Sequence, residues 1–146
     1  MKKTSCLIIL LISCFFFSCK KENVEGIVIN NTLLLSQSLS DNKELSSIIQ
    51  STLKGDYNSL RRLNHFPCGD GAGCYDLGYV ITQIIYKIGE SKFNEMVDKL
   101  DRKELFVMEG FISVGLEYGD NDYDGKKDCK NAELEFPTLI KKLREK

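Results

Sequence analysis

Residues 120–128 form an acidic loop whose side chains have the types and spacing that a bound calcium ion needs. Calcium prefers oxygen ligands from carboxylates and backbone carbonyls, and a glycine at the sixth place lets the chain turn around the ion. Gly125 stands at that place. The candidate ligands, with Lys126 contributing its backbone carbonyl, are Asp120, Asp122, Asp124, Lys126 and Asp128. We expect this loop either to bind calcium or to remain an acidic surface loop.

The spacing of these residues is similar to the first part of an EF-hand loop, but the second part departs from that pattern. The twelfth position, where an EF-hand has a glutamate, is Asn131, and Glu133 comes two residues too late. Lys127 stands where an apolar residue is usual. Asp, Asn and Gly also favour ordinary solvated turns. Three lysines of the loop could neutralise its carboxylates without a metal, namely Lys126, Lys127 and Lys130.

Cys68 and Cys74 are the second set of residues whose spacing suggests a chemical role. The stretch between them contains three glycines. Such a turn brings two sulfurs within bonding reach, and the thiols of exported proteins generally pair. We therefore expect a Cys68–Cys74 disulfide. Three alternatives stay open: a bridge from either cysteine to Cys129, a nucleophilic Cys68 with His65 as its base, and a metal site. The metal site is disfavoured because His65 is the one histidine of the chain.

Carboxylates and aromatic residues near the acidic loop suggest either acid–base chemistry or recognition. Glu109 and Glu117 interrupt an apolar stretch, as two catalytic carboxylates facing a groove would. Glu117, Tyr118 and Tyr123 form a candidate partner-binding surface, because tyrosine is enriched where proteins meet. Phe136 is expected to lie close to these tyrosines.

The first 22 residues have the composition of a secretion signal. Two lysines precede an apolar run over residues 7–17, and the tetrapeptide Phe16-Phe17-Ser18-Cys19 follows. This segment resembles the signal of bacterial lipoproteins, in particular those of the Bacteroidota, although an aliphatic residue is usual where Phe16 stands. The resemblance implies cleavage before Cys19 and acylation of its thiol. A spanning anchor is the alternative, but it needs about 20 apolar residues, more than this run contains.

The same resemblance implies a location in the bacterial cell envelope, lipid-anchored, in the outer membrane rather than the inner one. Lys20-Lys21-Glu22 is similar to stretches that mark such proteins for the cell surface. The implied partners are the lipid bilayer, through acylated Cys19, and another protein.

Composition gives no sign of a nucleic-acid partner. The 146 residues include 20 Lys and Arg against 21 Asp and Glu, and cleavage of the signal would remove Lys2 and Lys3. Proteins that bind nucleic acids carry a basic excess or a basic patch, and this chain has neither in its sequence. Its apolar content of 42% is enough for the core of one ordinary domain. Calcium is the one cofactor that the sequence suggests.

Hydrophobic periodicity predicts an all-α domain. Apolar residues repeat with the helical period over residues 41–54, 56–66, 75–88 and 91–100, in a fifth stretch after residue 101, and in a last one around 134–143. The expected N-caps are Ser40 or Asp41, Asp56 and Asp101, and the expected stops are Gly55 and Gly89. Neighbouring helices pair as hairpins, so the fold is either an irregular helical bundle or a short α-solenoid like HEAT or tetratricopeptide repeats.

These observations divide the chain into three parts. Residues 1–18 are the expected signal peptide, 19–39 a lipid-anchored N-terminus and linker, and 40–146 a single helical domain. The expected function is that of a membrane-anchored, exported lipoprotein that binds another protein, in one form as a toxin-immunity-type inhibitor. The alternatives are a cell-envelope hydrolase that uses acidic residues and an envelope scaffold that calcium makes rigid.

Overall fold

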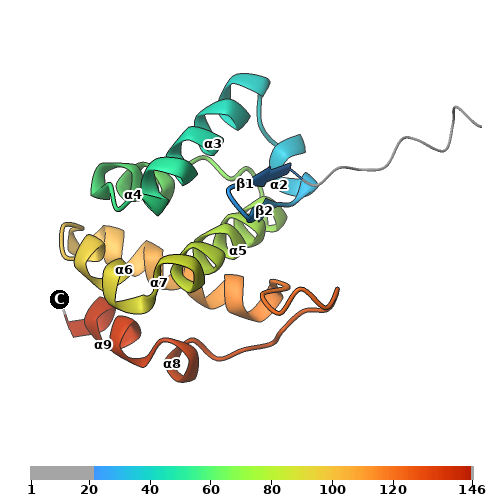
Figure 1. The fold of residues 1–146 in the computed structure, drawn as a ribbon. Coiled ribbons are helices and arrows are strands. Elements are labelled where there is room, and N and C mark those ends of the chain that lie inside the picture. The colour runs from blue at the N-terminus through green and yellow to red at the C-terminus, as the bar shows by residue number, and fades with distance from the viewer. Residues whose placement is uncertain (1–21, 146) are drawn as a thin grey trace, which may run out of the picture.

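Helix α5 lies at the centre of the fold, and the other elements pack around it (Figure 1). The structure is a computed structural model and describes residues 22–145. The strands are β1 (Glu22–Val24) and β2 (Ile27–Ile29). The helices are α2 (Asn31–Leu35), α3 (Leu39–Leu53), α4 (Tyr57–Asn64), α5 (Gly71–Ile88), α6 (Glu90–Val97), α7 (Arg102–Tyr118), α8 (Ala132–Glu135) and α9 (Pro137–Glu145). The described chain is mostly helical and forms a bundle, so the predicted all-α class is confirmed.

Helix α5 is central because its sequence is apolar on almost every face. Its fully buried apolar side chains are Leu77, Val80, Ile81, Ile84 and Ile85. The helix begins at Gly71, one turn before the predicted start, because the Asp70 side chain accepts a hydrogen bond from the Gly73 N–H and caps the first turn. It ends before Gly89, which adopts a φ of 86°, and this stop was predicted.

Helices α5 and α7 cross in direct backbone contact at two glycines. A Cβ atom on Gly115 would lie 2.2 Å from the carbonyl oxygen of Gly78. A Cβ atom on Gly78 would lie 2.4 Å from the carbonyl oxygen of Phe111. No side chain fits at these distances, because close-packed atoms do not approach one another so closely. The two glycines therefore set the separation of the two longest helices of the described chain.

Replacing Gly115 by Ala is expected to lower the free energy of unfolding by about 1–3 kcal/mol, because the added methyl group forces α5 and α7 apart. Gly110 provides a matched control on the same helix, since a Cβ atom there would meet nothing within 4 Å. Gly110→Ala should raise the unfolding free energy by about 0.5–1 kcal/mol, because alanine lowers the backbone entropy of the unfolded chain. Urea denaturation of both variants measures the difference, and equal effects would contradict the close crossing.

Side-chain caps also begin α3, α4 and α7. Asp56 caps α4 and Asp101 caps α7, as predicted. Helix α3 begins earlier than expected, because Ser38 is its N-cap rather than Ser40 or Asp41. The Asp41 side chain accepts a hydrogen bond from the Ser38 N–H and completes a capping box.

Glu104 is a buried carboxylate that ties α7 to α4. Its side chain is 7% exposed, accepts a hydrogen bond from the Asp101 N–H at 2.8 Å and forms an ion pair with Arg61 at 2.8 Å. His65 Nε2 lies 3.0 Å from the same carboxylate. Burial acts to raise the pKa of Glu104, but the hydrogen bonds from Asp101, His65 and Arg61 outweigh it and hold that pKa below its usual value.

Replacing Glu104 by Gln is expected to lower the unfolding free energy by about 1–3 kcal/mol at pH 7. A carboxylate whose pKa is lowered by folding stabilises the protein above its unfolded pKa, and this contribution is lost as pH falls through the folded value. The difference between the wild type and the variant should therefore shrink below about pH 4. Urea denaturation at pH 7 and pH 3 measures this difference in unfolding free energy. The control is Glu44→Gln, because Glu44 forms an exposed ion pair with Arg62. A difference that does not change with pH would contradict the ionised state of Glu104.

Residues 22–35 fold against the core as a hairpin and a short helix, within the stretch 19–39 where we expected the N-terminus and linker. Strands β1 and β2 are antiparallel, with Glu22 opposite Ile29. The turn between them consists of Glu25 and Gly26, which have φ values of 50° and 87°, as in a type I′ hairpin. The buried apolar side chains of the segment are Val24, Ile27, Ile29 and Leu33.

The side-chain amide of Gln83, on α5, closes the outer edge of β2. Its Oε1 accepts a hydrogen bond from the Val28 N–H at 2.8 Å, and its Nε2 donates to the Val28 carbonyl at 2.9 Å. Gln83 is itself buried. The amide thus takes both hydrogen bonds that a third strand would make at Val28.

The predicted last helix is two helices in the structure. Helix α8 ends at Glu135 and α9 begins at Pro137, because proline favours the first position of a helix and disfavours a helical conformation in the residue before it. Leu134, expected in the core, is 84% exposed. The side chains of α9 that enter the core are Leu139, Ile140 and Leu143.

Candidate functional site

The acidic loop between α7 and α8 is anchored by a buried asparagine. Asn121 donates a side-chain hydrogen bond to the Gly115 carbonyl at 3.0 Å and accepts one from Thr82 Oγ1 at 2.7 Å. The Tyr79 hydroxyl donates to the Asp120 carbonyl at 2.7 Å. These partners lie at the crossing of α5 and α7, so the same contact that sets the core also sets the position of the loop.

The carboxylates of the loop are engaged by the loop itself. Asp120 accepts hydrogen bonds from the N–H groups of residues 124 and 125, at 2.9 and 3.1 Å. Lys130 Nζ lies 2.6 Å from Asp122 and 3.7 Å from Asp128, and these carboxylates raise the pKa of Lys130. Lys126 lies 3.7 Å from Asp124. Internal neutralisation by lysine is therefore present.

The predicted calcium ligands are not gathered around one point. Within residues 22–145, no group of three or more His, Cys, Asp or Glu side chains is arranged to hold a metal ion. Calcium binding to this loop stays a prediction, and it would require the carboxylates to leave their present partners.

Two tyrosines and a lysine form a stack beside the loop. The rings of Tyr75 and Tyr118 lie 4.7 Å apart and are inclined by 10°. Lys127 Nζ lies 5.0 Å from the centroid of the Tyr118 ring, within the range of a cation–π contact. A hydrogen bond to Glu117, and the negative charge of that residue, raise the pKa of the Tyr118 hydroxyl. We call Tyr75, Tyr118 and Lys127 the tyrosine stack; a hollow of about 350 Å³ opens beside it, next to Thr32 of α2.

Tyr123 lies at the tip of the loop in a conformation that an aromatic residue rarely adopts. Its φ is 57°, and its side chain is 60% exposed. Its hydroxyl lies 3.4 Å from Gln83 Oε1. A bulky residue at positive φ costs folding free energy, and such residues are found in turns and at functional sites.

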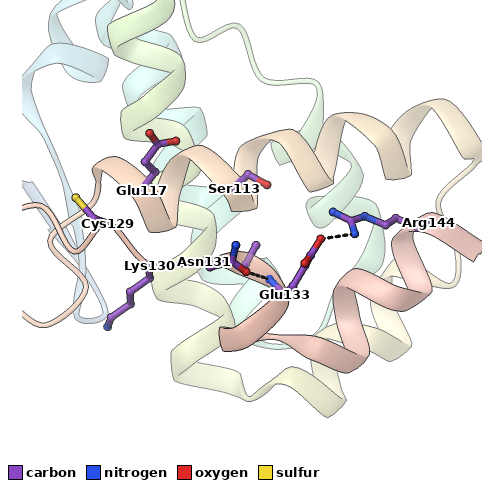
Figure 2. A pocket seen from close by; sticks show the side chains of 8 residues that line it. Ser113, Glu117, Cys129, Lys130, Asn131, Glu133 and Arg144 are labelled. Atoms are coloured by element: carbon purple, nitrogen blue, oxygen red, sulfur yellow. Dashed lines mark hydrogen bonds and ion pairs between the residues drawn. The ribbon is translucent and has the colours of Figure 1, made fainter.

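A second hollow, of about 400 Å³, lies on the other side of the loop between α7 and α9. Figure 2 shows residues that line this hollow, among them Ser113 and Glu117 on α7 and the loop residues Cys129 and Lys130. Glu133 closes one end through an ion pair with Arg144 at 2.5 Å. The loop is therefore a ridge with a hollow on each side, and Glu117 contributes to one and Tyr118 to the other.

The structure decides between the alternatives for the cysteines. Cys68 and Cys74 form a disulfide, as predicted, and Cys129 is free and exposed. A bridge to Cys129 is therefore wrong. A nucleophilic Cys68 with His65 as its base is also wrong, because Cys68 is bonded and His65 contacts Glu104.

The carboxylates proposed for acid–base chemistry are separated. Glu109 forms an ion pair with Arg144 at 2.6 Å. Glu117 lies eight residues further along α7, about 12 Å along the helix axis at 1.5 Å per residue. Phe136 does not join the loop tyrosines; it is buried and packs against Tyr86, with ring centroids 5.1 Å apart.

Two members of the tyrosine stack were not predicted as site residues. Tyr75 follows the disulfide cysteine Cys74 directly, and Lys127 belongs to the acidic loop. The contact between Tyr75 and Tyr118 joins residues far apart in the sequence, and no local pattern indicates it. The neighbouring disulfide is the one signal that pointed to a constrained position at residue 75.

Comparison with known proteins assigns no family. The chain matches no protein-family model, no curated protein and no solved structure. Among residues 22–145, no helix combines the length and the apolar character that crossing a bilayer requires.

Removing the disulfide is expected to destabilise the protein and loosen the tyrosine stack, because the bridge fixes the turn next to Tyr75. A loop of this size gives a contribution of about 2 kcal/mol from chain entropy. Thermal unfolding of the double variant Cys68→Ala, Cys74→Ala should therefore begin at a lower temperature and should not respond to reductant. Cys129→Ala is the control and should unfold like the wild type. A wild type that unfolds identically with and without reductant would contradict the bridge.

Proposed function

We propose that this protein is an exported lipoprotein, held on the bacterial envelope by acylated Cys19, that binds another protein through the ridge formed by the acidic loop. The observation that carries the proposal is the exposed Tyr123 at positive φ on a loop pinned by Asn121. The fold maintains this tyrosine in an unfavourable backbone conformation while leaving most of its side chain in water. A recognition role accounts for this unfavourable conformation better than a packing role does, because little of the ring is packed.

The surrounding surface supports a protein partner. Tyrosines held in place by their neighbours bury a large area at a small cost in side-chain entropy, which is why they dominate protein interfaces. Tyr118 is held by Tyr75 on one side and by the contact with Lys127. The hollows on either side of the ridge are open rather than enclosed, as suits the side chains of a protein partner.

The charge of the ridge supports a basic partner. Residues 117–131 contain five carboxylates and three lysines. Complementary charge steers association and excludes partners of the same sign. An exported toxin with a basic active site is one such partner, and an inhibitor of the immunity type would block it with a protruding acidic loop.

The anchor is tested by mass spectrometry of the protein extracted from its native membrane. The expected N-terminal peptide begins at Cys19 and carries diacylglycerol on the thiol. A peptide that begins at Met1 with a free thiol at residue 19 would contradict the anchor and the location in the envelope.

The partner is tested by placing a photo-reactive amino acid at position 123 in living cells. A single major cross-linked protein is expected from this position, and none from position 50, an exposed residue of α3. Helix α3 lies on the other side of α5 from the acidic loop (Figure 1). An exported toxin in the adduct would support the inhibitor role, and loss of toxin activity on mixing would confirm it. Unchanged toxin activity in an excess of the protein would remove the inhibitor role, and equal labelling from both positions would remove the binding ridge.

Tyr123→Gly separates recognition from stability. Glycine adopts positive φ without strain. The free energy of unfolding of the variant is therefore expected to equal that of the wild type or to exceed it by up to about 1 kcal/mol. Its cross-linking partner should bind at least about tenfold more weakly, because interface tyrosines commonly contribute more than 1 kcal/mol. Binding titration and urea denaturation measure the two effects. Unchanged affinity would show that Tyr123 is not part of the binding surface.

A further inference from the structure

The folded body begins very close to the proposed lipid anchor. Two residues lie between Cys19 and Glu22, and Glu22 is already the first residue of β1. Three backbone steps span at most about 10 Å. This inference rests on the proposed acylation of Cys19. Given that anchor, the body lies against the bilayer surface, and the face around the start of β1 is the one turned towards the lipid.

The pairing of β1 and β2 defines which elements share that face. Glu22 lies opposite Ile29, and α2 begins two residues later, at Asn31. The Glu22 carboxylate also accepts a hydrogen bond from Ser46 Oγ of α3 at 3.0 Å. The start of β1 therefore lies beside α2 and against one side of α3, as Figure 1 shows for these elements.

Two leucines of this region are almost fully exposed. Leu35, the last residue of α2, is 85% exposed, and Leu39, the first residue of α3, is 83% exposed. Leu39 and Ser46 are seven residues apart on α3, which is two turns, so they lie on the same side of the helix. Single exposed leucines are common on protein surfaces. These two flank one corner, capped at Ser38, and Leu39 lies about 10 Å along α3 from Ser46, which contacts the first residue of β1.

This corner carries charges of both signs. The carboxylates of Asp41 and Glu22 each accept a hydrogen bond from a serine, and the lysines are the charges that suit a lipid headgroup layer. Lys43 lies one turn after Leu39 on α3, is exposed, and has no ion-pair partner among residues 22–145. Lys20 and Lys21 stand between the anchor and β1 in the sequence. Apolar side chains flanked by lysines are typical of protein surfaces that lie in the interface of an anionic bilayer.

We propose that the corner formed by Leu35 and Leu39 docks on the bilayer that holds the anchor. The two leucine side chains enter the boundary between headgroups and acyl chains, and Lys43 lies at the level of the headgroups. The acyl chains hold the protein at the membrane, and this second contact sets its orientation.

The absence of tryptophan from the chain allows a direct test. Leu39→Trp and Leu134→Trp each introduce a single tryptophan at positions of nearly equal exposure, 83% and 84%. The full acylated protein is reconstituted into vesicles of phosphatidylethanolamine and phosphatidylglycerol in which part of the lipid has brominated acyl chains. Brominated lipid should quench the fluorescence of Leu39→Trp by about half or more, because the side chain enters the acyl boundary. Leu134→Trp should not change.

The outcomes separate the docking contact from the anchor on which it rests. Protein that does not float with the vesicles would contradict the anchor. Protein that floats, but whose two tryptophans are quenched equally, would overturn the docking proposal and leave the anchor intact. Adding Lys43→Glu to Leu39→Trp should reduce quenching without detaching the protein, and this second variant separates orientation from attachment.

Discussion

The backbone contact between α5 and α7 at Gly78 and Gly115 is the constraint on which the rest of the structure depends. It lets the two longest helices of the described chain approach until their backbones touch. The Gly115 carbonyl then lies where Asn121 can bond to it, and Thr82 meets the same asparagine from α5. A wider crossing would separate these partners. Core packing and the placement of the acidic ridge are thus consequences of one close approach.

Local sequence chemistry predicted much of the fold and little of the site. The caps at Asp56 and Asp101 and the stop at Gly89 depend on neighbouring residues alone, and the structure confirms them. The hairpin was missed because its strands are three residues long and Glu25 occupies a turn position where Asn, Asp or Gly is usual. Short strands carry too few residues for periodicity to distinguish them from a linker.

The candidate site residues are concentrated in one loop that the sequence marks, but the geometry of that loop depends on distant partners. The disulfide was accessible from spacing, since only a few residues separate the two cysteines. The stack of Tyr75 on Tyr118 and the burial of Asn121 depend on how α5 and α7 pack. The apolar stretch after residue 101 also includes Phe106, which the structure leaves exposed on α7. Apolar identity alone does not show which helix faces find a neighbour.

The contact of Gln83 with β2 has a consequence for solubility. A two-stranded sheet on a protein surface has open edges, and an open edge can recruit a strand from another copy of the chain. Here both backbone groups of Val28 are already bonded to an amide that comes from the protein's own central helix. The hairpin is therefore protected at this edge from growth into a shared intermolecular sheet, and a single buried glutamine provides that protection.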